Sequence, residues 1–324
     1  MKFCRRDFIR MAGAISAASA MSVARAQTYP SRTVRIVVGF PPGGVGDVLA
    51  RLMAQWLAEE LRQPFVVENR PGAAGNIAAE TVINAPADGH TLLFVGVNHA
   101  INATLYEKPS FDFVRDVAPI AGIVRLPNVM VVHPSFAATT VPEFIAFAAA
   151  SPGKINMASA GNGTSAHVTG ELFQIMSGIK MVHVPYRGGA PAVTDLLAGH
   201  VQVYFGPLPE SIEHIRGGTL RPLAVTSAAR LDILPSVPAM SEYLPGYEAT
   251  GWQGIGAPKK TPPEIIGLLN SQINAGLEDP NIRARLSGLG GSVLRGRPAD
   301  FAQLIAAEIE KWGKVVKAAH IKPE

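Results

Sequence analysis

The sequence predicts an α/β protein made of two units with a cleft between them. A chain of 324 residues is long enough for about two domains. Short β-branched segments alternate with helical segments, which is typical of parallel, helix-covered sheets. The alternation starts again near Asn128, and a later strand returns toward the first unit.

The first unit is predicted to have the order β-α-β-α-β. Strands are expected over 34–38, 64–68 and 91–95, with helices from Asp47 onward and over 74–84. Apolar residues after Asp47 recur at helical spacing, and the strands are short and rich in Val and Ile. Such an order favours parallel strands joined by crossover helices.

The second unit repeats this alternation before the chain returns. Strands are expected over 128–132, 155–158, 181–184, 201–205 and 221–225, and helices over 141–150, 165–177 and 190–198. Residues 252–256 are predicted to form the returning strand, followed by helices over 262–277 and 298–319. We therefore assign residues 27–127 and 252–324 to lobe 1 and residues 128–251 to lobe 2.

The basic excess of the chain lies entirely in its first 26 residues. The whole chain has a net charge of +4, from 29 Lys and Arg against 25 Asp and Glu. Residues 1–26 hold five basic residues and one acidic residue, so the remainder is balanced at 24 of each. This balance argues against nucleic acid or an anionic membrane surface as a partner.

Residues 1–26 have the layout of an export signal. A basic start is followed by an apolar stretch, too short and weak to span a membrane, and by an Ala-x-Ala pattern. Arg5 and Arg6, followed by Asp-Phe-Ile, resemble a twin-arginine motif; a general secretory signal that happens to hold two arginines is the alternative. By either route we expect cleavage after Ala26 and a periplasmic protein.

Catalytic and metal-binding signatures are missing from the sequence. The only cysteine, Cys4, lies in the leader, so the mature chain has no thiol for a disulfide, a metal site or a nucleophile. The eight histidines show no close paired spacing, and no G-x-S-x-G, P-loop or H-E-x-x-H motif occurs. We predict neither an enzyme nor a protein with a metal or cofactor.

Two glycine-rich loops are the best candidates for ligand binding, because ligands of open α/β sheets bind where strands end and helices begin. Residues 40–47 combine two prolines, three glycines and Asp47, which by its type is expected to be the helix N-cap. Backbone N–H groups in such a loop can bind an anion. A purely structural, capped turn explains these residues equally well.

The second loop, residues 159–167, offers three hydroxyls, an amide and free backbone N–H groups just before a helix. That chemistry suits a carboxylate. Gly161, Gly163 and Ala166 also fit the spacing of a dinucleotide fingerprint, but residues 172–194 contain no acid to bind a ribose. A nucleotide site is therefore disfavoured.

Two more loops follow strands. One covers residues 96–99; the other contains Tyr186 and Arg187. Tyr186 either lines a ligand pocket or sits at the edge of the core. Arg187 either attracts an anion to the mouth of the cleft or is simply solvated.

The mature chain closely resembles Bug-type extracytoplasmic solute receptors, the substrate-binding components of tripartite tricarboxylate transporters. The resemblance rests on many segments in order, among them Phe-Pro-Pro-Gly-Gly at 40–44, Asp-Val-Leu-Ala-Arg at 47–51, Gly-Asn-Gly-Thr at 161–164 and His-Val-Pro-Tyr at 183–186. Further matches are residues 29–32, 67–77, 223–227 and 311–316. It implies a type II-like periplasmic binding protein (flytrap) fold, in which two α/β lobes close on a small carboxylated ligand in the interdomain cleft.

In such receptors the loops that match 40–47 and 159–164 hold a ligand carboxylate, largely through backbone amides and ordered water. Adding the neighbouring strand ends gives the set of expected ligand-binding residues. These are Phe40, Gly43, Gly44, Gly46, Asp47, Asn98, Ser159, Gly161, Asn162, Gly163, Thr164, His167, Tyr186, Phe205 and Gly206.

The sequence departs from the family at two places. Relatives often carry an Asp just after the strand that matches 201–205, where Gly206 and Pro207 stand here. We therefore hypothesise a ligand without an ammonium group: a simple, dicarboxylic or aromatic acid. Asn98 and His99 replace a Ser/Thr-rich stretch, which changes the far end of the pocket.

The predicted function is capture of a small carboxylate in the periplasm by a monomeric receptor, followed by delivery to a transporter in the membrane. An orphan receptor that reports ligand occupancy to a sensor protein is the alternative. An exported α/β enzyme is a weaker alternative, because the sequence has no nucleophile or metal constellation.

Overall fold

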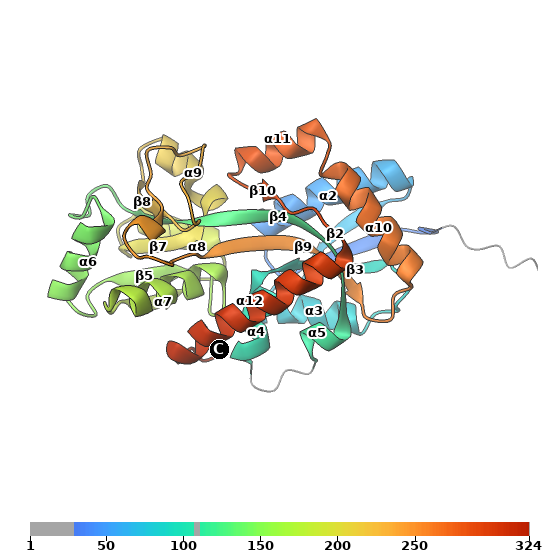
Figure 1. Cartoon of the computed structure of the whole chain (residues 1–324), viewed down its shortest axis with the longest axis horizontal. Coiled ribbons are helices and arrows are strands. Elements are labelled where there is room, and N and C mark those ends of the chain that lie inside the picture. The colour runs from blue at the N-terminus through green and yellow to red at the C-terminus, as the bar shows by residue number, and fades with distance from the viewer. Residues whose placement is uncertain (1–28, 107–110, 324) are drawn as a thin grey trace, which may run out of the picture. The chain divides into compact units, whose positions relative to one another are not determined.

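The computed structural model describes residues 29–106 and 111–323. The predicted export signal lies outside these residues. Residues 32–324 form one compact unit, and the fold given below is that unit alone (Figure 1).

The first part of the chain forms the parallel strands that the sequence predicts. Strand β1 (Val34–Val38) pairs in parallel with β2 (Phe65–Asn69) on one side and β3 (Thr91–Gly96) on the other. Helix α2 (Val45–Leu61) connects β1 to β2. The short 3-10 helix η1 (Ala73–Gly75) and α3 (Asn76–Ile83) connect β2 to β3. These strands lie within one residue of the predicted bounds.

Two long antiparallel strands run through the middle of the sheet. Strand β9 (Thr250–Pro258) pairs antiparallel with β3, and β4 (Val117–Val132) pairs antiparallel with β9 (Figure 1). Residues 117–127 of β4 pair with β9, whereas residues 128–132 pair with β7 (Val203–Pro207) and, in part, with β8 (Arg221–Val225). One sheet path therefore runs β2-β1-β3-β9-β4-β7-β5-β6.

The remaining strands form the other half of the sheet. Strand β5 (Asn156–Ser159) pairs in parallel with β6 (Val182–Pro185) and β7. Helices α6 (Val141–Ala150) and α7 (Ser165–Ser177) have the predicted bounds. Helix α8 (Gly189–Leu197) begins one residue earlier than expected and precedes β7.

The structure corrects the prediction in several places. The sheet is mixed rather than parallel, since β4 and β9 run against their neighbours. Strand β4 begins at Val117, earlier than predicted, because its prolines and Gly122 interrupt the strand pattern of the sequence. Two register shifts in the pairing of β4 with β9 accommodate these residues. Helix α4 (Val97–Leu105) starts directly after β3, where a loop was expected. Helix α9 (Leu208–Arg216) lies in a stretch that was given no element.

The C-terminal segment packs back over the sheet. Helices α10 (Pro263–Gly276) and α12 (Pro298–Ala318) were predicted; α11 (Pro280–Gly288), the two-residue strand β10 (Ser292–Val293), η2 (Met240–Glu242) and α5 (Phe113–Asp116) were not. Helix α12 contacts α4, α7 and β4. Trp252 of β9 is fully buried and meets the Phe301 ring of α12 edge-on. This packing anchors the two central strands.

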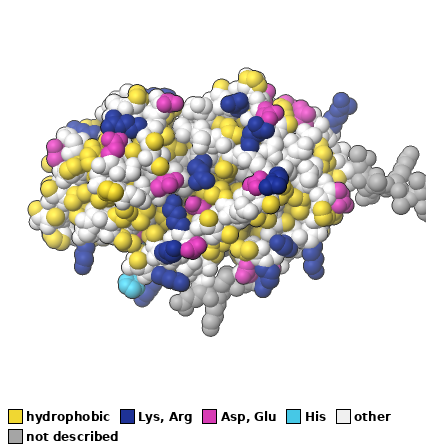
Figure 2. All heavy atoms as spheres, in the orientation of Figure 1, with side chains coloured by type: hydrophobic (Ala, Val, Ile, Leu, Met, Phe, Trp, Pro, Cys, Tyr) yellow, Lys and Arg dark blue, Asp and Glu magenta, His cyan; other side chains and the backbone are white. Residues whose placement is uncertain are grey.

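The described surface has the mixed charge that the balanced composition predicts. On the face drawn in Figure 2, basic and acidic side chains are interspersed. Among the described residues, no helix is long and apolar enough to cross a membrane.

Candidate functional site

A cavity of about 750 Å³ lies among the beginnings of three helices, α2, α7 and α8. Its volume is in the range of small-molecule sites. The lining residues are Val38, Gly39, Phe40, Pro41, Pro42, Gly43, Gly44, Val45, Gly46, Val48, Phe94, Val97, Asn98, His99, Ala160, Thr164, Ser165, Ala166, Arg187, Gly188, Gly189, Ala190, Pro191, Val193, Thr194, Leu197, Pro207, Pro209, Glu210, His214, Gln253 and Leu289. Most of the walls are apolar, with a few polar groups among them.

The loop between β1 and α2 presents backbone rather than side chains. Gly44, in an extended conformation, is the N-cap of α2, and no side chain caps the helix. Gly43 adopts φ +81°, a left-handed conformation that favours glycine. The N–H groups of residues 45–47 form no hydrogen bond within the described chain. They are available to an anion at the positive end of the helix dipole.

Asp47 braces this loop from behind, which corrects the expectation that it is the N-cap. It is the third residue of α2, is buried and does not line the cavity. Its carboxylate accepts hydrogen bonds from Gly43 N at 3.0 Å and Arg51 Nε at 3.0 Å. It also accepts one from Asn69 Nδ2 at 3.0 Å, which ties α2 to the end of β2. Burial opposes ionisation, but these hydrogen bonds outweigh it and lower the pKa of Asp47.

The loop between β5 and α7 has a similar opening toward the cavity. Thr164 is the N-cap of α7 but makes no side-chain cap; its Oγ1 donates to Gly161 O at 2.7 Å instead. The N–H groups of residues 165–167 form no hydrogen bond within the described chain. Ser165 and Ala166 line the cavity. A second helix therefore begins with unpaired donors at the same cavity.

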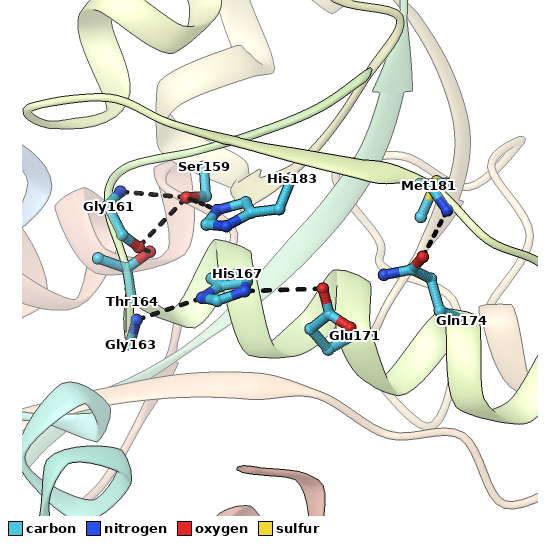
Figure 3. Close-up of polar contacts among 9 residues, drawn as sticks. All are labelled: Ser159, Gly161, Gly163, Thr164, His167, Glu171, Gln174, Met181 and His183. Atoms are coloured by element: carbon cyan, nitrogen blue, oxygen red, sulfur yellow. Dashed lines mark hydrogen bonds and ion pairs between the residues drawn. The ribbon is translucent and has the colours of Figure 1, made fainter. Parts of the chain in front are cut away.

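Ser159, His167 and His183 brace the second loop (Figure 3). Ser159 Oγ accepts from Gly161 N at 3.1 Å and lies 2.6 Å from His183 Nε2. The rings of His183 and His167 stack with centroids 3.6 Å apart, and His167 Nδ1 accepts from Gly163 N at 3.3 Å. Burial, and then the neighbouring His167, lower the pKa of His183 to about 3, so its ring is neutral.

The third helix beginning is tied to the second loop. Gly188 is the N-cap of α8, and its N–H donates to Ala160 O at 3.2 Å, which joins this turn to the second loop. Tyr186 packs against the core of this half, and its hydroxyl donates to Asp195 Oδ2 at 2.6 Å. Burial, and then Asp195, raise the pKa of Tyr186 to about 12. Arg187 lines the cavity and is exposed.

Six of the predicted site residues line the cavity together: Phe40, Gly43, Gly44, Gly46, Asn98 and Thr164. The other nine do not line it: Asp47, Ser159, Gly161, Asn162, Gly163, His167, Tyr186, Phe205 and Gly206. Phe205 is buried in the core against Phe173, with ring centroids 5.2 Å apart. Several of the nine, Asp47, Ser159 and His167 among them, shape the loops that do reach the cavity.

Residues outside the prediction also reach the cavity, notably Glu210, His214 and Gln253. Glu210 and His214 belong to α9; Pro209 followed by Glu210 is a helix-start signal that could have revealed this helix. The hypothesis of a ligand without an ammonium assumed that no acid replaces the missing Asp after β7. The structure corrects that assumption, because Glu210 lies on the cavity wall.

No group of three or more His, Cys, Asp or Glu residues that could hold a metal ion occurs among residues 29–106 and 111–323. The polar groups at the cavity are backbone N–H donors, amides, hydroxyls and a few titratable side chains. This arrangement is suited to holding an anion without a metal.

Comparison with known proteins gives the family. Residues 49–321 match the tripartite tricarboxylate transporter family receptor, TctC. The chain belongs to this receptor family. It is 36% identical over 311 residues to protein BugT of Bordetella pertussis, with 95% of each chain covered. It is also 36% identical over 312 residues to a protein from the tcbD–tcbE intergenic region of Pseudomonas sp. strain P51, covering 95% and 93% of the two chains.

Solved structures of TctC-type receptors are similar throughout. R. palustris Rpa4515 with adipate has a TM-score of 0.87 at 38% identity, covering 91% of this chain and 100% of that one. MatC from Rhodopseudomonas palustris with bound malate has a TM-score of 0.84 at 31% identity, covering 89% and 100%. The periplasmic binding protein BugD has a TM-score of 0.85 at 30% identity, covering 91% and 100%.

These likenesses confirm the predicted Bug-type resemblance and the two-lobed periplasmic binding protein fold. They also confirm that the protein is a receptor rather than an enzyme, since its family and structural neighbours bind solutes.

Proposed function

We propose that this receptor captures a small carboxylated organic compound in the periplasm and delivers it to a tripartite tricarboxylate-type transporter. The observation that carries the proposal is the meeting of two uncapped helix beginnings, α2 and α7, at one cavity. Receptors of the same family, with adipate or malate bound, support a carboxylate as the ligand.

The ligand carboxylate is held by the unpaired N–H groups at residues 45–47 and 165–167. Charged acceptors form stronger hydrogen bonds with backbone N–H groups than neutral acceptors do, and both helix dipoles favour the anion. The glycines at 43, 44 and 46 allow the ligand to approach the backbone closely. Of the nine predicted residues that do not line the cavity, Ser159, His167 and Asp47 act by positioning these loops.

Closure of two lobes on the ligand is part of the proposal. Lobe 1 comprises residues 27–127 and 252–324, and lobe 2 comprises residues 128–251. The exchange of partner along β4, from β9 to β7 at residue 128, supports a hinge within the two central strands. Closure requires that the ligand bind the closed state more tightly than the open state. The closed form is then presented to the membrane partner.

The N-terminal leader completes the proposal. Residues 1–26 direct export through the twin-arginine route, for which Arg5 and Arg6 are the signal. Cleavage after Ala26 then releases a monomeric receptor. Edman sequencing of the secreted protein, with a start at Gln27, tests this step.

The site is tested with the mature chain and a substitution that fills the helix beginning without straining it. A Cβ on Gly44 would meet only Pro41 O, at 3.6 Å, so Gly44→Val should fold normally and obstruct the donors of α2. Thermal shift identifies binding acids, and calorimetry measures their affinity. We expect a loss of at least about tenfold, or ~1.4 kcal/mol, for every acid.

Gly267→Val in α10 is the matched control. Gly267 has nothing within 4 Å of its Cβ position and does not line the cavity. If wild type, Gly44→Val and the control bind the acids with equal affinity, the ligand carboxylate is not held at the beginning of α2.

A further inference from the structure

A half-buried carboxyl group lies on the cavity wall, apart from the uncapped beginnings of α2 and α7. Glu210, in the first turn of α9, follows β7 and lines the cavity. Its carboxyl group lies directly on Gly189, the first residue of α8: a Cβ at Gly189 would overlap all three carboxyl atoms. Glycine at this position therefore leaves room for an acid.

Only one of the two carboxyl oxygens of Glu210 has a partner. The hydroxyl of Tyr204, a fully buried residue of β7, donates to Oε2 at 2.5 Å. Oε1 forms no hydrogen bond with any residue that the structure describes. One oxygen is therefore fixed by the protein, while the carboxyl group as a whole remains on the cavity wall.

Few charged groups surround this carboxyl. His214, one turn further along α9, and Arg187, in the turn before α8, also line the cavity. Asp195 of α8 is tied to Tyr186 Oη and lies near His200. Strand β4, which also packs against α9, contributes no residue to the cavity. No described basic group forms an ion pair with Glu210 within 4 Å, so Oε1 is free to accept a hydrogen bond from a ligand in the cavity.

We propose that Glu210 contacts a second polar group of the ligand. It favours a hydrogen-bond donor there, a hydroxyl or an ammonium, over a second carboxylate. This inference rests on the proposed function, because the ligand's first carboxylate is assigned to α2 and α7. An ionised Oε1 accepts a hydrogen bond from a donor but repels a second carboxylate. The apolar walls, including Phe94, Val193 and Leu197, suit an aliphatic segment between the two polar groups.

The selectivity should weaken in acid. Burial raises the pKa of Glu210 to about 7, and the hydrogen bond from Tyr204 partly offsets this rise. Above this pH the ionised group disfavours a diacid. Below it the protonated group can donate to a second carboxylate, which itself stays ionised because free carboxyl groups titrate near pH 4.

The test compares acids that differ only in the second polar group. Adipate and 6-hydroxyhexanoate have six carbons; succinate and 4-hydroxybutyrate have four. Calorimetry at pH 6 and pH 8 gives the affinity ratio of hydroxy acid to diacid at each length. For wild type we expect the hydroxy acid to be favoured at pH 8 by about tenfold at the fitting length, and by clearly less at pH 6.

Glu210→Gln is the informative variant, because the amide keeps the shape, carries no charge and can donate. In this variant the diacid should gain affinity at pH 8, and the ratio should no longer change with pH. Glu213→Gln on the same helix is the control; its side chain is 76% exposed and pairs with Arg216, outside the cavity. It should behave as wild type.

The outcomes separate this inference from the proposed function. If Glu210→Gln leaves the ratio and its pH dependence unchanged while Gly44→Val still weakens the binding of every acid, the role proposed for Glu210 is wrong and the carboxylate site stands. A wild-type ratio that favours the diacid at pH 8 at both lengths also overturns the inference. If Gly44→Val binds every acid as wild type does, the proposed function fails, and the inference fails with it.

Discussion

The loops that begin α2 and α7 present similar groups to the cavity but are held in opposite ways. Both end in an uncapped helix with unpaired N–H groups. The first is held by the ionised carboxylate of Asp47, which binds Gly43 and an arginine. The second is held by Ser159 and a stacked pair of histidines, of which His183 is neutral. Similar backbone presentation thus rests on an ionised carboxylate at one loop and on a hydroxyl and a neutral His183 at the other.

The largest effect is expected from removing the charged brace. Asp47→Ala removes a buried carboxylate that accepts hydrogen bonds from the Gly43 N–H, Arg51 and the Asn69 amide, which should lower the free energy of unfolding by about 2–3 kcal/mol. Affinity for the carboxylate should fall as well, because the α2 loop loses its support. Urea unfolding and calorimetry measure the two effects. A variant with wild-type stability and affinity would show that Asp47 does not support the α2 loop.

Removing the histidine brace should cost less. His183→Ala removes the ring stacked on His167 and the group beside Ser159 Oγ, with an expected loss of about 1–2 kcal/mol in unfolding free energy. His200→Ala is the control, since the His200 side chain is 70% exposed. If the two alanine variants unfold at the same urea concentration, the stacked pair is not a brace.

The two braces should respond to pH in different ranges. The pKa of His183 is lowered to about 3 from 6.5, so its contribution is complete above pH 6.5 and declines as the pH falls below it. Burial lowers the pKa of His99 to about 4, with the same sign. The pKa of Asp47 is lowered from 3.8, so its contribution is lost only at more acid pH.

Unfolding free energy should therefore decline between pH 6.5 and 5, and His183→Gln should reduce that decline while Asp47→Asn should not. Urea unfolding at half-unit pH steps measures the slope. A slope that His183→Gln leaves intact would assign the titration to other groups.

The smallest effect is expected at the outer edge of the second brace. Glu171 Oε1 lies 3.6 Å from His167 Nε2, a distance too long for a good hydrogen bond. Glu171→Gln should change the unfolding free energy by less than about 0.5 kcal/mol at pH 7. A loss as large as that of His183→Ala would mean that His167 is charged and bound to this carboxylate.

Much of the fold could be predicted from the sequence, because helices and strands with a clear hydrophobic periodicity are recognisable there. Helices α6 and α7 and strand β1 have the predicted bounds. The first eleven residues of β4 were missed, since Pro119 and Gly122 interrupt the strand pattern and pairing with β9 stabilises them there. Helix α9 was missed because it is short and begins directly after a strand.

The candidate site was predicted less completely than the fold. The composition of the loops predicted the glycines that line the cavity, because a cluster of glycines just before a helical segment can be recognised from sequence alone. Which side chains face inward was not visible: Phe205 turns to the core, and Asp47 turns behind its loop. Glu210 depends on how α9 lies against α8, a tertiary relation that no local pattern encodes.

A crystal structure of the mature receptor with adipate bound would locate the carboxylate itself. We predict one carboxylate within hydrogen-bond distance of N–H groups among residues 45–47 and, in the same molecule, among residues 165–167. A carboxylate bound instead through the side chain of Arg187, with the beginnings of α2 and α7 untouched, would contradict the binding mode proposed for this receptor.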